Sequence, residues 1–398
     1  MNYKRITLSA GKEKSLLRSH PWLFSGAISN IEKEVEEGDL VSVYAADNRF
    51  IASGFYQQGS IAVKVLTFEQ EDIDERFWLS RVADAITYRK SMGLFDNEDT
   101  TIFRLINGEG DFLPSLIADY YEGLVVVQFH SVGMFRNQEH IVAALLEVLG
   151  KSCKAIFSKS SSTLPKKGGI FTKDEFIYGQ VDSTWTAKEH GLTYQIDYAE
   201  GQKTGFFIDQ RDNRQMLQQI ARGKRVLNAF GYTGGFSVSA LAAEAKSVLT
   251  LDISKRAIEL CDKNVEMNFA DAAHKAEAVD VLEYLNELNT TPDEAFEVII
   301  LDPPAFAKHT KDLKQGLKGY RTINQKAIEK IAKGGFLFTF SCSQTVSVDD
   351  FATMLFSSAA LARRNVRIVK RLHASYDHPQ SIYHPEGEYL KGFLLYVE

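Results

Sequence analysis

The sequence has few cysteines and no long apolar run, and each scarcity excludes a class of protein. Its three cysteines, Cys153, Cys261 and Cys342, are far apart, with no CxxC pair and no histidine cluster nearby. This spacing argues against a disulfide framework or a zinc site and predicts a reducing, cytoplasmic compartment without a bound metal. No stretch approaches the roughly 20 consecutive apolar residues of a membrane span, and residues 1–17 lack the apolar core of a signal peptide. We therefore expect no membrane partner.

An excess of positive charge is also absent, since the formal net charge is −6 at pH 7. Binding of nucleic acid would therefore depend on the local field of basic clusters. The segment 308–321 holds five Lys or Arg and one His against one Asp, and 363–371 holds five Lys or Arg and no acid. Each cluster is compatible with an RNA-contacting surface or with a solvated helix face.

The length and composition predict two or three domains with well-buried cores. The chain has 398 residues, of which 44% are hydrophobic and 25% are charged, as in soluble globular proteins. Residues 1–70 contain short β segments broken by glycine and polar turns, and we interpret them as a small β domain. Residues 71–188 mix helical and strand patterns and predict a middle α/β domain with an RNA-binding or connecting role. Residues 189–398 form the third predicted domain.

The third domain alternates apolar strands with helical patterns. The predicted strands are 225–230, 247–252, 298–302 and 335–341. Patterns with helical spacing, such as 236–245 and 255–268, lie between them. This alternation predicts an α/β fold with a doubly wound, mainly parallel sheet. Ligands of such sheets bind at the carboxyl ends of the strands, so the residues that follow each strand are the candidates for function.

Two strand ends carry features of a nucleoside cofactor site. The glycine-rich segment 231–235 follows the first strand, and Asp252 ends the second, where an acid can accept hydrogen bonds from ribose hydroxyls. A dinucleotide site has a similar layout, but the GxGxxG spacing is absent. After the third of these strands, Asp302 precedes Pro303 and Pro304, which fix an extended backbone without N–H donors. The combination favours S-adenosylmethionine over a dinucleotide.

These motifs resemble the Rossmann-type methyltransferases. The matching segments are FGYTGGFSVSALAAEAKSVLTLDIS, VIILDPPAFAK, FTFSCSQ and, upstream, GQKTGFFIDQRDNR. They are similar in particular to the bacterial 23S rRNA cytosine-C5 methyltransferase family, which carries an N-terminal PUA domain. The resemblance implies a PUA-like domain at 1–70, a Rossmann-like S-adenosylmethionine-dependent domain at 189–398, and RNA, with 23S rRNA foremost, as the partner.

The resemblance also implies cofactor-binding residues. It places Phe230 and Gly231 at the methionine side, Asp252 at the ribose, Asp280 near the adenine, and Arg211 and Asp302 close to the cofactor. For Asp280, a helix N-cap before Val281 is an alternative.

Cys342 fits the chemistry of C5 methylation. C5 of cytosine becomes nucleophilic only after a thiolate adds at C6, so the reaction needs a cysteine at a strand end that faces the methyl donor. Cys342 directly follows the strand 335–341 in a polar Ser-Cys-Ser-Gln context, whereas Cys261 and Cys153 fit buried structural positions. A buried structural role is the alternative for Cys342 as well.

Asp302 is the second predicted catalytic residue, because its carboxylate could hold the N3–C4 edge of the base. A related group of RNA methyltransferases has a second cysteine after the first proline, where this chain has Pro304. The group that removes the C5 proton is therefore unassigned. The target base must be unstacked, and flanking phosphates would lie on a basic loop at 308–321. The predicted substrate contacts are Pro303, Pro304, Phe306, Lys308, Lys311, Lys314, Lys318 and Arg321.

Two other functions are compatible with the sequence. One is methylation of a purine, at guanine N7 or an exocyclic amine, which needs no nucleophile. The other is an RNA-binding factor with an inactive methyltransferase-like domain. The sequence leaves the oligomeric state open, with a homodimer as one possibility.

Overall fold

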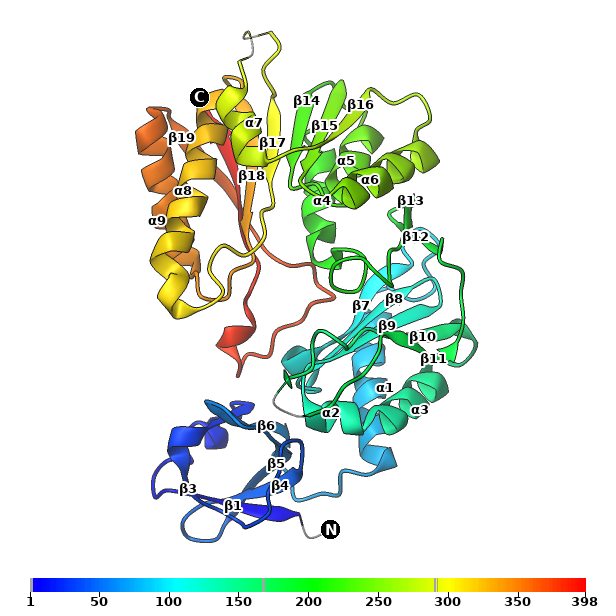
Figure 1. Ribbon diagram of the computed structural model, residues 1–398, viewed down its shortest axis with the longest axis vertical. Helices are drawn as coiled ribbons and strands as arrows, with labels where there is room; N and C mark the ends of the chain where they lie inside the picture. The colour runs from blue at the N-terminus through cyan, green and yellow to red at the C-terminus, as the bar shows by residue number, and fades with distance from the viewer. Residues whose placement is uncertain (1–2, 167–168, 290, 292) are drawn as a thin grey trace. The chain divides into compact units, whose positions relative to one another are not determined.

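The computed structural model describes residues 3–166, 169–289, 291 and 293–398, and the chain divides into two compact units (Figure 1). Unit 1 is made of residues up to Lys188, 196–206 and 376–387. Unit 2 is made of 189–195, 207–375 and 388–398. The domain boundaries predicted at 70/71 and 188/189 stay predictions.

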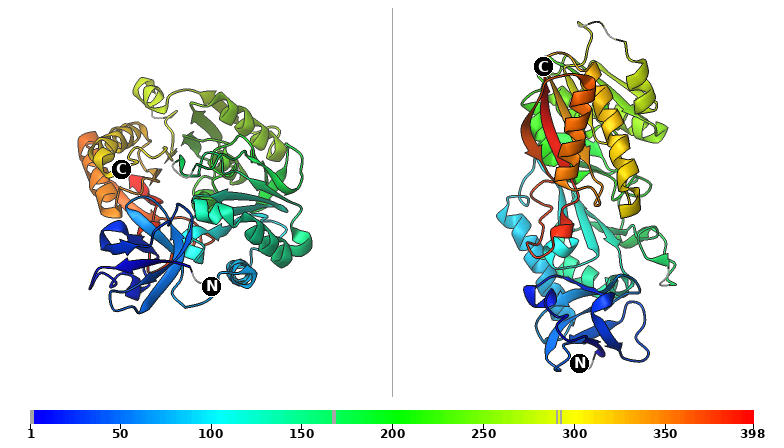
Figure 2. Two further views of the ribbon diagram at one scale, coloured as in Figure 1. Left: turned by 60° about the horizontal axis from the view of Figure 1, so that its bottom comes forward. Right: turned by 90° about the vertical axis from the view of Figure 1, so that its left-hand side faces the viewer.

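The first sheet of unit 1 is a curled six-stranded sheet near the N-terminus (Figure 2). Its strands are β1 (Lys4–Leu8), β2 (Trp22–Phe24), β3 (Ile28–Ile31), β4 (Leu40–Tyr44), β5 (Phe50–Tyr56) and β6 (Ile61–Thr67). The order is β2-β6-β5-β4-β1-β3, with β1 and β4 parallel and the other neighbours antiparallel. Residues such as Ile6, Val41 and Val63 are fully buried in one shared core, which stabilises this small sheet.

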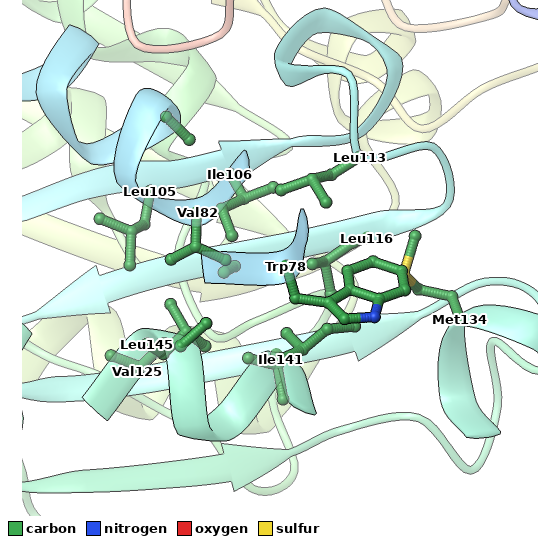
Figure 3. Packing of buried hydrophobic residues seen from close by; sticks show 14 of the residues in the cluster. Trp78, Val82, Leu105, Ile106, Leu113, Leu116, Val125, Met134, Ile141 and Leu145 are labelled. Carbon is green, nitrogen blue, oxygen red and sulfur yellow. The ribbon is translucent and has the colours of Figure 1, made fainter. Parts of the chain in front are cut away.

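The second sheet of unit 1 has five strands and packs with three helices. Its strands are β7 (Ile102–Asn107), β8 (Leu116–Tyr121), β9 (Leu124–Phe129), β10 (Ala155–Ser158) and β11 (Glu175–Gly179), in the order β11-β10-β9-β8-β7. The helices are α1 (Glu75–Ser91), α2 (Val132–Arg136) and α3 (Gln138–Leu149). Asp74 caps α1 by accepting from the N–H groups of Arg76 and Phe77. The spacing of Trp78 and Val82 then turns one face of α1 into the core, where both are fully buried (Figure 3).

Unit 2 contains a seven-stranded, mainly parallel sheet. Its strands are β14 (Arg225–Ala229), β15 (Ser247–Asp252), β16 (His274–Ala278), β17 (Val298–Leu301), β18 (Gly335–Ser341), β19 (Val366–Leu372) and β20 (Lys391–Val397). The order is β16-β15-β14-β17-β18-β20-β19, and β20 runs antiparallel to both of its neighbours. The direction of winding therefore reverses between β14 and β17, the point at which such sheets bind ligands. Among the described residues, β12 (Thr186–Glu189) and β13 (Leu192–Gln195) form a further two-stranded sheet, of which Glu189 and β13 belong to unit 2.

The helices of unit 2 form two groups, as right-handed crossovers require when the strand order reverses (Figure 1). One group is α4 (Arg211–Gln218), α5 (Gly235–Ala242) and α6 (Lys255–Asn268). The other group is α7 (Val281–Glu287), α8 (Leu313–Lys330) and α9 (Val348–Ala362). A one-turn 3-10 helix, η6 (Ile208–Gln210), directly precedes α4, and another, η7 (Thr310–Asp312), precedes α8.

The structure confirms the predicted α/β fold and corrects two details. The segment 308–321 is not a loop throughout, because 313–321 form the first half of α8. The alternative of a solvated helix face is wrong for most of 363–371, since 366–371 lie in β19 at the edge of the sheet. An exposed edge strand carries polar residues on both faces, so its sequence lacks the apolar pattern of a buried strand.

Candidate functional site

The turn after β14 has a strained backbone that brings it close to the sheet. Phe230 and Tyr232 both adopt left-handed φ angles, of 61° and 46°, although neither is glycine. Gly231 lies between them, and a Cβ atom there would be 2.3 Å from the Cγ2 of Thr250 and 2.9 Å from the Nδ2 of Asn228. Only glycine fits this position. Such strained conformations cluster at ligand-binding sites, and the turn lies where the sheet reverses its winding.

The Asp252 carboxylate is fixed between this turn and the next helix. Its Oδ2 accepts from the N–H of Tyr232 at 3.0 Å, and its Oδ1 accepts from the N–H of Ser254 at 2.9 Å. The half-buried carboxylate is thus held at the end of β15, where a ribose diol could reach it. Asp280 caps α7, because its side chain accepts from the N–H of Glu283 at 2.9 Å. The cap accounts for Asp280 locally, and its contact with an adenine stays a prediction.

Asp302 directly follows β17 and is oriented by a chain of buried amides. The Nε2 of Gln210, in η6, donates to the Oδ2 of Asp302 at 3.0 Å. The Nδ2 of Asn213 donates to the Oε1 of Gln210 at 2.6 Å and to the carbonyl of His373 at 3.1 Å. Gln210 and Asn213 are 2% and 3% exposed, so water does not compete for these bonds. Neither Gln210 nor Asn213 is predictable from local sequence patterns, because each gains a role only through contacts with residues far away in the sequence.

The prolines after Asp302 differ in exposure. Pro303 is buried, Pro304 is exposed, and Phe306 is half-buried against the ring of Tyr320, with centroids 4.6 Å apart. Phe306 is thus packed from one side by α8. The predicted contacts of these three residues with a substrate stay predictions.

Hydrogen bonds join this segment to the residues that follow β18. The Oγ of Ser343 lies 2.9 Å from the hydroxyl of Tyr320 and accepts from the N–H of Ala307 at 3.3 Å. The hydroxyl of Thr345 donates to the carbonyl of Ala307 at 3.2 Å. Gly316 of α8 permits the close approach, since a Cβ there would be 2.7 Å from that of Ala307. These contacts hold the segment that follows β17 and the segment that follows β18 together at the carboxyl edge of the sheet.

Cys342 stands apart from the other two cysteines. It is half-buried at the end of β18, and its Sγ lies 3.8 Å from the carbonyl oxygen of Pro303. Cys153 and Cys261 are buried, and burial raises the pKa of Cys153 to about 11 and that of Cys261 to about 12. Those two thiols are therefore inert near neutral pH. Among the three cysteines, Cys342 has the exposure and the strand-end position that a nucleophile needs.

Arg211, predicted to lie close to a cofactor, begins α4 in a fully buried ionic cluster. Its Nε lies 3.8 Å from the Oε2 of Glu189. Glu189 also accepts two hydrogen bonds of 2.6 Å from Arg214. Two buried guanidinium groups thus share one buried carboxylate, an arrangement that fixes the start of α4 beside Gln210. The predicted contact of Arg211 with the cofactor stays a prediction.

The basic residues of 308–321 share one surface. Lys308, Lys311, Lys314, Lys318 and Arg321 are all exposed. The last four follow helical spacing and line a groove of about 640 Å³ between the neighbouring helices α8 and α9, yellow and orange in Figure 2. From α9, the groove is lined by Asp350, Thr353, Met354 and Ser357. α8 begins eleven residues after Asp302 and α9 six residues after Cys342, so both helices follow the sheet edge that carries these two residues.

Among residues 3–166, 169–289, 291 and 293–398, no group of three or more His, Cys, Asp or Glu side chains is arranged to hold a metal ion. Within the same ranges, no helix combines the length and apolarity needed to cross a membrane.

Two family models match the sequence. Residues 103–388 match the model of S-adenosylmethionine-dependent methyltransferases, and residues 6–68 match that of a PUA-like domain. The chain is 38% identical over 397 residues to the ribosomal RNA large subunit methyltransferase I of Pseudoalteromonas atlantica, with 99% of each chain covered. It is 35% identical over 397 residues to the protein of the same name from Vibrio vulnificus, covering 98% of this chain and 99% of the other.

Solved structures share the fold over the full length. A structure from Streptococcus mutans described as that of a SAM-dependent methyltransferase has a TM-score of 0.84 at 22% identity, with 100% of both chains covered. A methyltransferase structure complexed with SAH has a TM-score of 0.85, also at 22% identity and full coverage. These matches confirm the predicted combination of a methyltransferase fold with an N-terminal PUA-like β domain.

Proposed function

The chain belongs to the S-adenosylmethionine-dependent methyltransferase family, and we propose that it methylates C5 of a cytosine in 23S ribosomal RNA through Cys342. The large-subunit rRNA named in its relatives supports the substrate class, and the PUA-like domain supports RNA as the partner. The half-exposed Cys342 lies at the same sheet edge as Asp252 and Asp302, and this position is the observation that supports methylation at C5.

The cofactor fits the first half of this edge. The left-handed turn at 230–232 provides a close backbone approach, and Asp252 provides a fixed carboxylate for the ribose hydroxyls. Phe230 and Gly231 would face the methionine part, Asp280 would lie near the adenine, and Arg211 would lie close to the cofactor. When bound, S-adenosylmethionine supplies an electrophilic methyl group.

The protein residues would activate the base. The thiolate of Cys342 adds to C6, which breaks the aromaticity of the ring and makes C5 nucleophilic. Asp302 holds the N3–C4 edge and stabilises the protonated ring nitrogen as the adduct forms, and Gln210 keeps its carboxylate oriented. C5 then takes the methyl group and passes its proton to a base, the ring nitrogen releases its own proton, and the thiolate leaves C6 to restore the aromatic ring.

The substrate must present this cytosine outside a base stack, because C6 is attacked from the face of the ring. Pro304 and Phe306 would border the flipped base. The groove between α8 and α9 would hold the flanking phosphates through Lys311, Lys314, Lys318 and Arg321. The exposed Lys308, three residues before Lys311, would be a further contact with the RNA.

A methylation assay on deproteinised 23S rRNA with labelled cofactor, followed by nucleoside analysis, tests the proposal. We expect 5-methylcytidine from the native protein and none from Cys342→Ala, with cofactor binding retained. Cys153→Ala is the matched control, since it removes a buried thiol in the other unit. RNA containing 5-fluorocytidine should remain covalently attached, because the fluorine on C5 cannot be removed as a proton.

Other outcomes would separate the alternatives. A labelled purine, or turnover of Cys342→Ala within a few-fold of the native rate, would exclude the covalent C5 mechanism. Absence of any transfer to RNA that the protein binds would indicate an RNA-binding factor without activity.

A further inference from the structure

A buried lysine stands at the start of β20, beside the segment that carries Cys342. Lys391 is 3% exposed, and it pairs with Ser341, the last residue of β18, in the antiparallel register. Its Nζ donates to the carbonyl oxygen of Ser343 at 2.7 Å. A lysine side chain is almost never this buried unless its ammonium group is paired with a hydrogen-bond acceptor or an opposite charge.

This hydrogen bond helps to hold the segment Ser341-Cys342-Ser343 in place. Ser343 is already held through its side chain by Tyr320 and by the N–H of Ala307. Lys391 holds the carbonyl of the same residue, so the peptide that follows Cys342 is fixed at both its side chain and its backbone. A carbonyl is a neutral acceptor, so this hydrogen bond does not neutralise the charge of the ammonium group, and Cys342 is the residue directly before Ser343.

The charges of Lys391 and Cys342 act on each other. Burial lowers the pKa of Lys391, while negative charge on Glu388 and on Cys342 acts in the opposite direction. An attraction of this kind is mutual, so the ammonium stabilises a thiolate as much as the thiolate stabilises the ammonium. Further ionisable groups near this segment are Tyr320, whose pKa is raised by burial, the exposed Glu388, and Asp302, which follows β17.

We propose that Lys391 is a positioning residue for methyl transfer, which fixes the segment carrying Cys342 and favours the thiolate of that cysteine by its positive charge. The role rests on the proposed function, in which Cys342 is the nucleophile. No redox partner or additional cofactor is needed, because the ammonium keeps its proton throughout the reaction.

The rate of Cys342 alkylation by iodoacetamide, measured against pH by mass spectrometry, tests this role without any methyl transfer. A nearby opposite charge shifts such titrations by about one to three pH units. For Lys391→Met we expect the midpoint of the rate profile to move up by about one unit, which lowers the rate near pH 7 about tenfold. Lys391→Gln keeps a donor for the Ser343 carbonyl but no charge, and it should show the same shift. Lys391→Arg should stay near the native profile.

Lys330→Met is the matched control. Lys330 also donates to a backbone carbonyl, that of Leu288, at 2.6 Å, but it lies at the opposite end of the sheet. Its loss should leave the alkylation profile unchanged. If Lys391→Met does not fold, Lys391→Gln decides the question.

Coincident profiles for the native protein and the uncharged, folded Lys391 variants would overturn the role of the charge, even if their turnover falls. This failure is distinct from failure of the proposed function, which would appear as methyl transfer by Cys342→Ala. Alkylation of Cys342 reports the influence of Lys391 in either case.

Discussion

The amide chain behind Asp302 leads to a quantitative prediction for Gln210→Ala. This substitution removes the 3.0 Å hydrogen bond to the carboxylate and the acceptor used by Asn213, in a region that is almost fully buried. A hydrogen bond to a charged group is worth about 1.5–3 kcal/mol. If that energy orients Asp302 in the transition state, kcat/KM should fall roughly ten- to a hundredfold, since each 1.36 kcal/mol is a factor of about ten.

The assay is steady-state transfer of labelled methyl groups to 23S rRNA, with thermal unfolding measured in parallel. Gln215→Ala is the matched control, because Gln215 is an exposed glutamine on the adjoining helix α4. Asn213 keeps its second acceptor, the carbonyl of His373, so the structure should tolerate the change.

A double-mutant cycle with Asp302→Asn identifies the route of the effect. If Gln210 acts through the carboxylate, Gln210→Ala should cost much less in the Asp302→Asn background than in the native protein. Additive losses in the cycle would refute this reasoning. A loss of less than twofold for Gln210→Ala alone would refute it as well.

Two further predictions concern the cofactor and the RNA. Asp252→Ala should weaken binding of S-adenosylhomocysteine by roughly 1–3 kcal/mol in calorimetry, because ribose hydroxyls and the turn N–H lose their acceptor; an unchanged affinity would mean that the ribose lies elsewhere. Reversing three charges of the α8 groove should flatten the slope of log affinity for RNA against log salt by up to about two units, at ~0.7 per phosphate, without changing cofactor affinity. The reversed residues are Lys311, Lys314 and Lys318. The control is the same charge reversal at three exposed lysines near the other group of helices, which should leave the salt dependence as in the native protein. Native salt dependence of the groove variant would exclude the groove as the RNA contact. The control residues are Lys246, Lys255 and Lys263.

Local patterns predicted most of the unit 2 sheet, because its central strands are continuous apolar runs. The four residues of β17, for example, are all buried, and turn residues bound the run. No such pattern predicts β19, in which the five residues 367–371 are exposed at the sheet edge and three of them are cationic. β19 pairs with β20, and the eighteen residues between the two strands have no helix or strand pattern that would predict this pairing.

The candidate-site residues that stand directly at the end of a strand were predictable from the sequence. Asp252, Asp302 and Cys342 stand at strand ends, so the sheet topology brings them to one edge. Gln210 and Lys391 were not predictable in this way. Gln210 contacts a residue 92 positions away, and Lys391 contacts one 48 positions away. Neither contact can be predicted from the residues next to Gln210 or Lys391 in the sequence.

The assignment of residues 376–387 to unit 1 has a consequence for how the protein is made. Asp377, fully buried, accepts from the N–H of Arg104 at 2.8 Å, and its carbonyl accepts from the buried guanidinium of Arg89 at 2.8 Å. Arg89 and Arg104 are synthesised first, and Asp377 follows 273 residues after Arg104. At about 5–20 residues per second, the delay is on the order of ten seconds or more. Unit 1 therefore reaches its final packing only after residues 207–375 of unit 2 have been synthesised, which couples the maturation of the two units.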